Sequence, residues 1–149
     1  MRHSLHTEIE IEADPKIVWS ILTDLDQYPS WNPFIVAASG RIAVGERLTN
    51  RMRPPGGKAM TFKPVLTVVE TQQTLEWLGR LAVPGIFDGR HRFELTSTPS
   101  NGTHLVHTEQ FNGVLVRFLR KSLDTNTRQG FENMNQALKA RAEALAKAR

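Results

Sequence analysis

Residues 14–34 read DPKIVWSILTDLDQYPSWNPF, and this stretch decides the fold. Asp14 is a residue type that accepts the unpaired N–H groups at a helix start, and Pro15 fits the first helical position because its missing donor is not needed there. A short helix with one apolar stripe is predicted by the helical spacing of Val18, Ile21, Leu22 and Leu25.

The second half of this stretch predicts another, very short helical turn. Thr23 or Asp24 can cap the turn, Pro29 closes it, and an extended run begins at Phe34. Three aromatic residues lie close to this join: Tyr28, Trp31 and Phe34. A short helix, a break and a strand in this order indicate a plug at the mouth of a curved sheet.

Outside this stretch, alternating apolar and polar residues predict strands. Residues 5–12 alternate between an apolar face and an acidic outer face. Further strands are predicted at 34–39, 46–53, 60–71, 75–81, 87–98 and 103–111, which gives about seven antiparallel strands. Pro64 indicates an edge position or a bulge in the run 60–71, because proline has no N–H for the ladder.

The last part of the chain has a helical pattern. No proline follows Leu115, and steps of three or four residues join the mainly apolar series Leu119, Leu123, Thr127, Phe131, Met134, Leu138, Ala142 and Leu145. Gly130 falls inside this predicted helix, where it allows a bend or a close approach to the sheet. The predicted fold is therefore α+β: a curved antiparallel sheet wrapped around a long C-terminal helix, with two short helices after the first strand. Such a sheet leaves a cavity beneath the helix.

Composition limits the class of protein. We expect residues 1–149 to form one domain, since 40% hydrophobic and 23% charged residues are ordinary for a globular chain. The absence of cysteine excludes disulfides, thiolate nucleophiles and cysteine metal sites. The net charge of +4 comes from scattered basic residues without a nucleic-acid-binding motif. No run approaches the roughly 20 apolar residues of a membrane span, and we expect a cytoplasmic location.

The last two strands predict a polar group inside the cavity. His91, Phe93 and Leu95 share one face of their strand, and Leu105, His107, Glu109 and Phe111 share one face of the next. If the loop between them has an odd number of residues, Leu95 pairs with Leu105, Phe93 with His107 and His91 with Glu109. Two imidazoles and a carboxylate then line an otherwise apolar concavity.

This polar group has more than one interpretation. His107 and Glu109, with His91, are candidates for orienting a ligand or for acid–base catalysis, because burial and a neighbouring charge shift the pKa of a carboxyl group in opposite directions. The alternative is structural, with these side chains bridging to each other or to the backbone. Two histidines and a glutamate also suggest zinc, but no further pattern supports a metal, and we expect none.

Other residues are candidates for the cavity wall. Asn50 and Asn135 supply neutral polar groups. Aromatic and apolar candidates are Tyr28, Trp31, Trp77, Phe93, Phe111, Phe131, Met134 and Leu138. For Trp77 a position in the ordinary core is the competing interpretation.

The order of these elements resembles the START-like (SRPBCC) superfamily, in its polyketide cyclase/dehydrase branch. The resemblance depends on residues 14–34, on Phe87-Asp88-Gly89-Arg90-His91-Arg92-Phe93, and on the run from His107 to Gly113. It covers essentially the whole chain and implies a helix-grip fold with a deep hydrophobic cavity. No residue constellation matches the active residues of the cyclases.

Three functions are consistent with these patterns. The first is binding of a small hydrophobic molecule, lipid-like or aromatic. The second is an enzyme of the polyketide cyclase/dehydrase type that uses the inward His/Glu pair. The third is an interaction module of the chaperone-activator type. We expect no cofactor, no nucleic-acid partner, and a monomer or weak homodimer.

Overall fold

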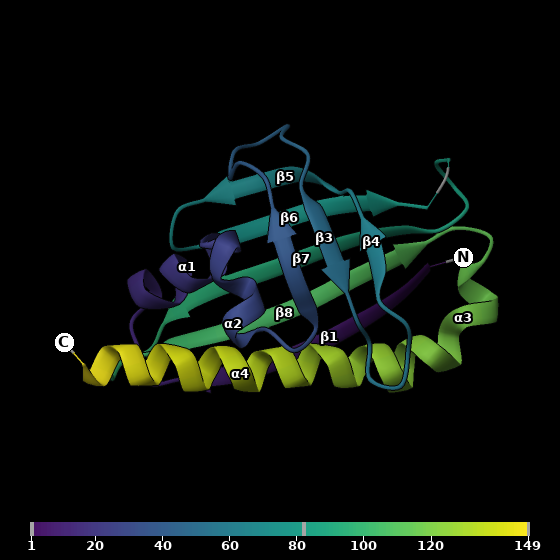
Figure 1. Cartoon of the computed structure of the whole chain (residues 1–149). Helices are drawn as coiled ribbons and strands as arrows, with labels where there is room; N and C mark the ends of the chain where they lie inside the picture. The colour runs from purple at the N-terminus through teal and green to yellow at the C-terminus, as the bar shows by residue number, and fades with distance from the viewer. Residues whose placement is uncertain (1, 82, 149) are drawn as a thin grey trace.

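The computed structural model describes residues 2–81 and 83–148 (Figure 1). This part of the chain contains eight strands: β1 (Arg2–Ile11), β2 (Ile35–Ser39), β3 (Thr49–Met52), β4 (Met60–Phe62), β5 (Val65–Glu70), β6 (Thr74–Arg80), β7 (Asp88–Ser97) and β8 (Thr103–Asn112). The expected class is confirmed: an α+β fold in which curved antiparallel strands accompany a long C-terminal helix, with short helices after β1.

The strands form two antiparallel sheets, of order β1-β8-β7-β6-β5 and β2-β3-β4. The expected single strand over 60–71 is wrong, because Pro64 cannot donate to a ladder and the run divides into β4 and β5. The two sheets meet at this point. The N–H of Leu48 donates to the carbonyl of Pro64 (2.8 Å), and the N–H of Leu66 donates to the carbonyl of Glu46 (2.9 Å).

The short helices follow β1 as predicted. Helix α1 (Pro15–Thr23) begins with Pro15, and the Asp14 carboxylate accepts the N–H of Ile17 at 3.0 Å, which confirms the expected cap. A 3₁₀ turn, η1 (Leu25–Gln27), leads into α2 (Tyr28–Trp31). Asp24 precedes this turn without a side-chain capping bond.

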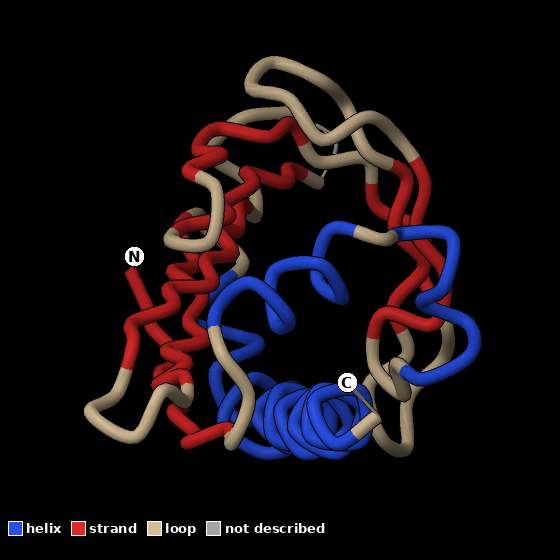
Figure 2. The backbone as a smooth tube through the Cα atoms, turned by 90° about the vertical axis from the view of Figure 1, so that its left-hand side faces the viewer, coloured by secondary structure: helices blue, strands red, loops and turns tan. Residues whose placement is uncertain are grey.

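The C-terminal helix has three parts: α3 (Val116–Ser122), a π-helical turn η2 (Leu123–Thr127), and α4 (Arg128–Lys147). Helix α4 packs along β1 and against α1. Gly130 lies where a Cβ would overlap the ring of Phe34, so the expected close approach is confirmed. Seen nearly along α4, the strands rise on both sides of the helix (Figure 2).

The core lies between α4 and the concave side of the strands. Its fully buried side chains include Leu5, Phe93, Leu105, Phe131 and Leu138. Among the helices in the described residues, none combines the length and hydropathy needed to cross a membrane.

Candidate functional site

A cavity of about 330 Å³ opens between the two sheets and the α3–η2 segment. Its wall is mainly apolar. The larger apolar residues that line it are Phe34, Met52, Met60, Phe62, Trp77, Leu81, Phe87, Phe111, Leu119 and Leu123. The polar side chains that line it are Asn50, Arg80, His91, Glu109, Ser122 and Thr127.

Strand pairing brings His91 and Glu109 together. The loop between β7 and β8 runs from Thr98 to Gly102, an odd number of residues, and Leu95 pairs with Leu105, Phe93 with His107 and His91 with Glu109. The conditional register predicted from the sequence is therefore confirmed. Nδ1 of His91 lies 3.3 Å from Oε1 of Glu109, with the His91 side chain 1% and the Glu109 side chain 12% exposed.

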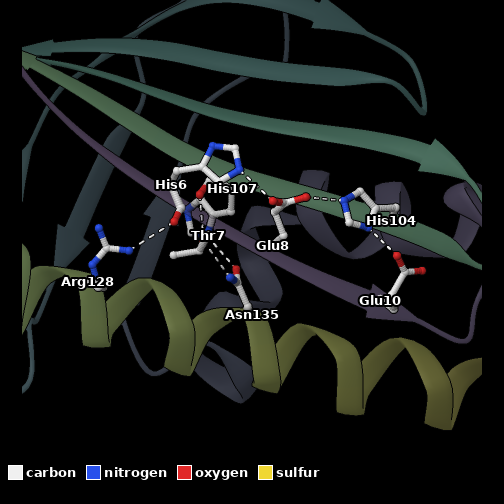
Figure 3. A network of polar contacts seen from close by, with 8 residues as sticks. All are labelled: His6, Thr7, Glu8, Glu10, His104, His107, Arg128 and Asn135. Atoms are coloured by element: carbon white, nitrogen blue, oxygen red, sulfur yellow. Dashed lines mark hydrogen bonds and ion pairs between the residues drawn. The ribbon is translucent and has the colours of Figure 1, made fainter.

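His107 lies behind the cavity wall rather than on it. Its Nε2 is 2.6 Å from Nε2 of His91, and its Nδ1 is 2.7 Å from Oδ1 of Asn135 on α4. Asn135 donates to Thr7 Oγ1 (2.9 Å), and Thr7 donates to the carbonyl of His107 (2.7 Å), as Figure 3 shows. Burial lowers the pKa of His107 well below the usual value of 6.5, the nearby His91 lowers it further, and the bond to Asn135 opposes the shift.

Stacked rings hold both imidazoles in place. The ring of His107 stacks on Phe131 (centroids 4.2 Å apart) and on Phe93 (4.3 Å). The ring of His91 lies 4.9 Å from Trp77 and from Phe131. Because these apolar contacts restrict the ring orientations, the two imidazoles present fixed nitrogen atoms to each other and to Glu109.

Asn50 carries an unpartnered polar atom into the cavity. It lies on β3, on the smaller sheet, and is 1% exposed. Its Oδ1 has no hydrogen-bond partner among the described residues. A buried amide oxygen without a partner is costly, so this position favours a ligand with a hydrogen-bond donor.

The structure divides the predicted site residues into three groups. Five line the cavity: Asn50, Trp77, His91, Glu109 and Phe111. Four lie behind the cavity wall: His107 and Asn135, which are hydrogen-bonded to each other, and Phe93 and Phe131, whose rings stack on His107. Four lie away from it: Tyr28, Trp31, Met134 and Leu138.

The residues placed away from the cavity have physical reasons for their positions. The Tyr28 hydroxyl is buried and donates to the carbonyl of Leu22 (2.6 Å), and burial raises the pKa of this phenol well above its ordinary value. Trp31 lines a separate hollow near the end of α4. Met134 and Leu138 are fully buried in the core and do not line the cavity.

The sequence patterns missed part of the wall. Leu119, Ser122, Leu123 and Thr127 reach the cavity because α3 and η2 turn toward it. Gly89 also lines the cavity, and a Cβ there would overlap the Glu109 carboxylate. A glycine inside a strand is the one signal in the sequence that points to such a close approach.

Metal binding has no support from side-chain clusters in the described part of the chain. Across residues 2–81 and 83–148, no three His, Asp or Glu side chains are grouped as ligands for a metal ion.

Comparison with known proteins places the chain in a family. Residues 2–143 match the family model described as "Polyketide cyclase / dehydrase and lipid transport". The chain belongs to this family. No curated protein sequence matches it. The fold is similar to that of a START superfamily protein from Mycobacterium smegmatis, which aligns with a TM-score of 0.74 at 19% identity, over 96% of this chain and 99% of that one.

Two aromatase/cyclases of known structure share the family fold. ZhuI from Streptomyces sp. R1128 aligns with a TM-score of 0.80 at 13% identity, over 100% of this chain and 97% of that one. The di-domain StfQ from the steffimycin biosynthetic pathway also aligns at 0.80, with 14% identity over 99% of this chain. The chain spans 53% of StfQ and 51% of the similar di-domain BexL. Identities this low show the shared fold alone.

Proposed function

We propose that this protein binds a small hydrophobic molecule, lipid-like or aromatic, in the cavity between the sheets and the α3–η2 segment. The observation that carries the proposal is an apolar cavity of about 330 Å³ with a buried, unpartnered amide oxygen in its wall. Cavities of this size and lining are typical of sites for small organic ligands. Membership of a family described as including lipid transport supports the same function.

The expected affinity follows from the apolar lining. A ligand that buries about 400 Å² of apolar surface gains about 10 kcal/mol at roughly 25 cal/mol per Å². Part of this free energy is lost when the ligand is immobilised, and about −8 kcal/mol corresponds to a micromolar dissociation constant. We therefore expect micromolar binding.

Titration with the neutral fluorescent dye N-phenyl-1-naphthylamine tests the proposal, together with a variant that fills the cavity. Gly79→Leu places a side chain in the cavity, since a Cβ there meets only ordinary contacts, the nearest at 3.7 Å from Pro64. Gly57→Leu is the matched control, because Gly57 is exposed in the loop before β4.

The proposal expects saturable binding by the wild type and by Gly57→Leu, and loss of binding in Gly79→Leu with an unchanged near-ultraviolet circular dichroism spectrum. Equal binding by all three proteins would place the dye outside the cavity and contradict the proposal. Native mass spectrometry of protein purified from its own host then identifies a bound molecule.

Catalysis of the polyketide cyclase/dehydrase type is the second candidate function. The specific observation in its favour is the His91–Glu109 pair, which lines the same cavity at 3.3 Å. Such a pair can move a proton for a substrate held in one conformation. Glu109→Gln and His91→Gln, with binding and turnover measured separately, distinguish the functions: an enzyme loses turnover, whereas a carrier changes only in affinity.

A further inference from the structure

The polar side chains behind the cavity form one continuous chain of hydrogen bonds. It starts at Glu109 in the cavity wall and passes through His91, His107 and Asn135 to Thr7. Thr7 and Asn135 also line a polar groove on the opposite side, between β1 and α4. The donors and acceptors in this chain can be assigned one at a time.

The assignment begins at a group that only accepts, the backbone carbonyl of His107. Thr7 donates its single hydroxyl proton to this carbonyl at 2.7 Å, so toward Asn135 the hydroxyl is an acceptor (Figure 3). Asn135 must then turn its NH₂ group to Thr7, at 2.9 Å. Its carbonyl oxygen therefore faces Nδ1 of His107, at 2.7 Å, and accepts a proton from it.

The proton on His107 determines which nitrogen of His91 carries a proton. Burial lowers the pKa of His107 well below 6.5, so near neutral pH its ring carries one proton, which is the proton on Nδ1. Its Nε2 is then an acceptor. Nε2 of His91, 2.6 Å away, must carry the proton between the two rings.

What remains is the contact between Nδ1 of His91 and Oε1 of Glu109. With no proton there, a nitrogen lone pair would face a carboxylate at 3.3 Å. With two protons, a net positive charge would stand in a wall that is mainly apolar. One proton makes the pair electrically neutral, whichever of the two atoms holds it.

We propose that His91 and Glu109 share a single proton at the cavity wall, and that Thr7 and Asn135 are the positioning residues that put it there. The cavity therefore takes a neutral apolar ligand with a hydroxyl group, which can donate to the Asn50 amide oxygen, in preference to an organic anion. The ligand preference rests on the proposed function; the proton assignment does not.

The other polar and charged groups around the His91–Glu109 pair supply no further buried charge to it. From β6, Arg80 lines the cavity, but its side chain is 49% exposed and lies 3.8 Å from Asp88. From β3, α3 and η2 the cavity receives neutral side chains only: Asn50, Ser122 and Thr127. From α4, the neutral Asn135 amide contacts His107.

Nitrogen-15 NMR of ligand-free protein labelled at histidine tests the proton assignment. Long-range spectra distinguish the ring nitrogen that bears hydrogen. We expect His107 as the Nδ1–H form with no titration between pH 6 and 8, and a proton on Nε2 of His91. An Nε2–H form of His107, or its titration in this range, overturns the assignment.

Asn135→Asp provides the sharpest test, because it reverses the chain with an isosteric side chain. The new carboxylate favours a doubly protonated His107, whose Nε2–H then donates to His91. The proton between the two rings then lies on Nε2 of His107 instead of Nε2 of His91, and the proton shared by Nδ1 of His91 and Glu109 stays in place. Gln136→Glu is the matched control, since it adds the same charge one residue away on the exposed face of α4 and should leave both rings unchanged. An unchanged His91 in Asn135→Asp overturns the positioning role.

Two ligands with the same ring system test the preference. We expect 2-naphthalenemethanol, which is neutral and carries a hydroxyl donor, to bind the wild type at least about 10-fold more tightly than 2-naphthoate, because burial of an unpaired anion is unfavourable. Glu109→Gln keeps a hydrogen-bond donor toward His91 and should reduce the difference in affinity between the neutral compound and the anion. Equal binding of both compounds overturns the preference. Failure of both to bind counts against the proposed function and leaves the NMR result to decide the proton assignment separately.

Discussion

His107 is the buried imidazole on which the polar chain depends. It is fully buried, and its ring nitrogens contact a neutral amide and another imidazole. A charged imidazole at this position would lack a counter-ion, which is why burial lowers its pKa. At the residue scale, His107 therefore works as a neutral linker behind the wall, and His91 is the imidazole that the cavity contacts.

This burial predicts a stability that falls with acid. The folded pKa of His107 is lowered, so below about pH 6.5 the unfolded chain binds a proton that the folded chain refuses, and the free energy of unfolding decreases as the pH falls. His104 acts in the opposite direction. The hydrogen bonds that its ring donates to Glu8 and then to Glu10 raise its pKa, so its stabilisation is present below about pH 6.5 and is lost as the pH rises through the folded value.

Urea unfolding at pH 5, 6, 7 and 8 measures the net effect of His107 and His104 on the free energy of unfolding. We expect the buried group to dominate, because the bonds of His104 are exposed and screened by solvent. The carboxyls with lowered pKa, Glu8, Glu76 and Glu143, act below their ordinary value of 4.5, outside this range. His107→Gln should flatten the pH dependence and His104→Gln should steepen it; a slope unchanged in His107→Gln contradicts the assignment.

A pair of glycines provides a second test at the residue scale. Gly79 and Gly89 face each other across β6 and β7, and both line the cavity. A Cβ on Gly89 would overlap the Glu109 carboxylate, whereas a Cβ on Gly79 has only ordinary contacts. Gly89→Ala should lower the free energy of unfolding by about 1–3 kcal/mol through this overlap, and Gly79→Ala should change it by less than about 0.5 kcal/mol. Chemical denaturation compares the two, and equal effects would show that the carboxylate moves aside freely.

At the scale of elements, the C-terminal helix owes its position to Gly130. In a helix interior alanine is favoured over glycine by about 1 kcal/mol. Here a Cβ would overlap the ring of Phe34, next to β2. The packing between α4 and the segment before β2 therefore overrides helix propensity.

Gly130→Ala should lower the free energy of unfolding by about 1–3 kcal/mol despite the better propensity of alanine. Glu132→Ala, on the exposed face of α4, is the control and should be nearly neutral. Adding Phe34→Leu should recover part of the loss, measured by a double-mutant cycle in urea. Additive effects would mean that the two side chains do not clash.

The π-helical turn η2 sets which side of α3 faces the cavity. Its residues Leu123 and Thr127, with Leu119 in α3, line the wall. A π turn contains one residue more than a regular α-helical turn. Removal of that residue rotates α3 relative to α4 by about 100° and shifts it by about 1.5 Å.

Deletion of Thr125 should therefore retain the helix content and reduce dye binding at least about 10-fold, since Leu119 and Leu123 leave the wall. Thr125→Ala is the control, because Thr125 is exposed and its hydroxyl donates to the carbonyl of Lys121 in its own helix. Circular dichroism and fluorescence titration measure the two effects. Unchanged binding in the deletion variant would remove α3 from the site.

At the scale of the whole molecule, the cavity exists because two sheets and one interrupted helix meet around it. A ligand that binds the folded chain alone stabilises it by mass action, by about 2.7 kcal/mol at 100 times its dissociation constant. For a chain of this length that corresponds to a rise in Tm of about 5–10 °C. Thermal unfolding with 2-naphthalenemethanol should show this rise in the wild type and none in Gly79→Leu; the same rise in both proteins would place the ligand elsewhere.

Local sequence determined the elements and much of their pairing. The Asp14-Pro15 helix start, the two short helices, the strands and the C-terminal helix follow from capping chemistry and from the two hydrophobic periods, which act over a few residues. The pairing of His91 with Glu109 follows from strand parity and an odd loop. The order of these elements also predicted the family, which the match over residues 2–143 confirms.

Tertiary structure alone decided which residues reach the cavity. The apolar residues Tyr28, Met134 and Leu138 are suited to a cavity wall but are buried elsewhere. In contrast, the cavity wall includes Leu119 and Leu123 because of a π turn that no sequence pattern predicted. The bond from Thr7 to the carbonyl of His107 joins residues separated by 100 positions. Periodicity assigns a side chain to a face, but the part of that face that stays uncovered depends on how distant elements pack against one another.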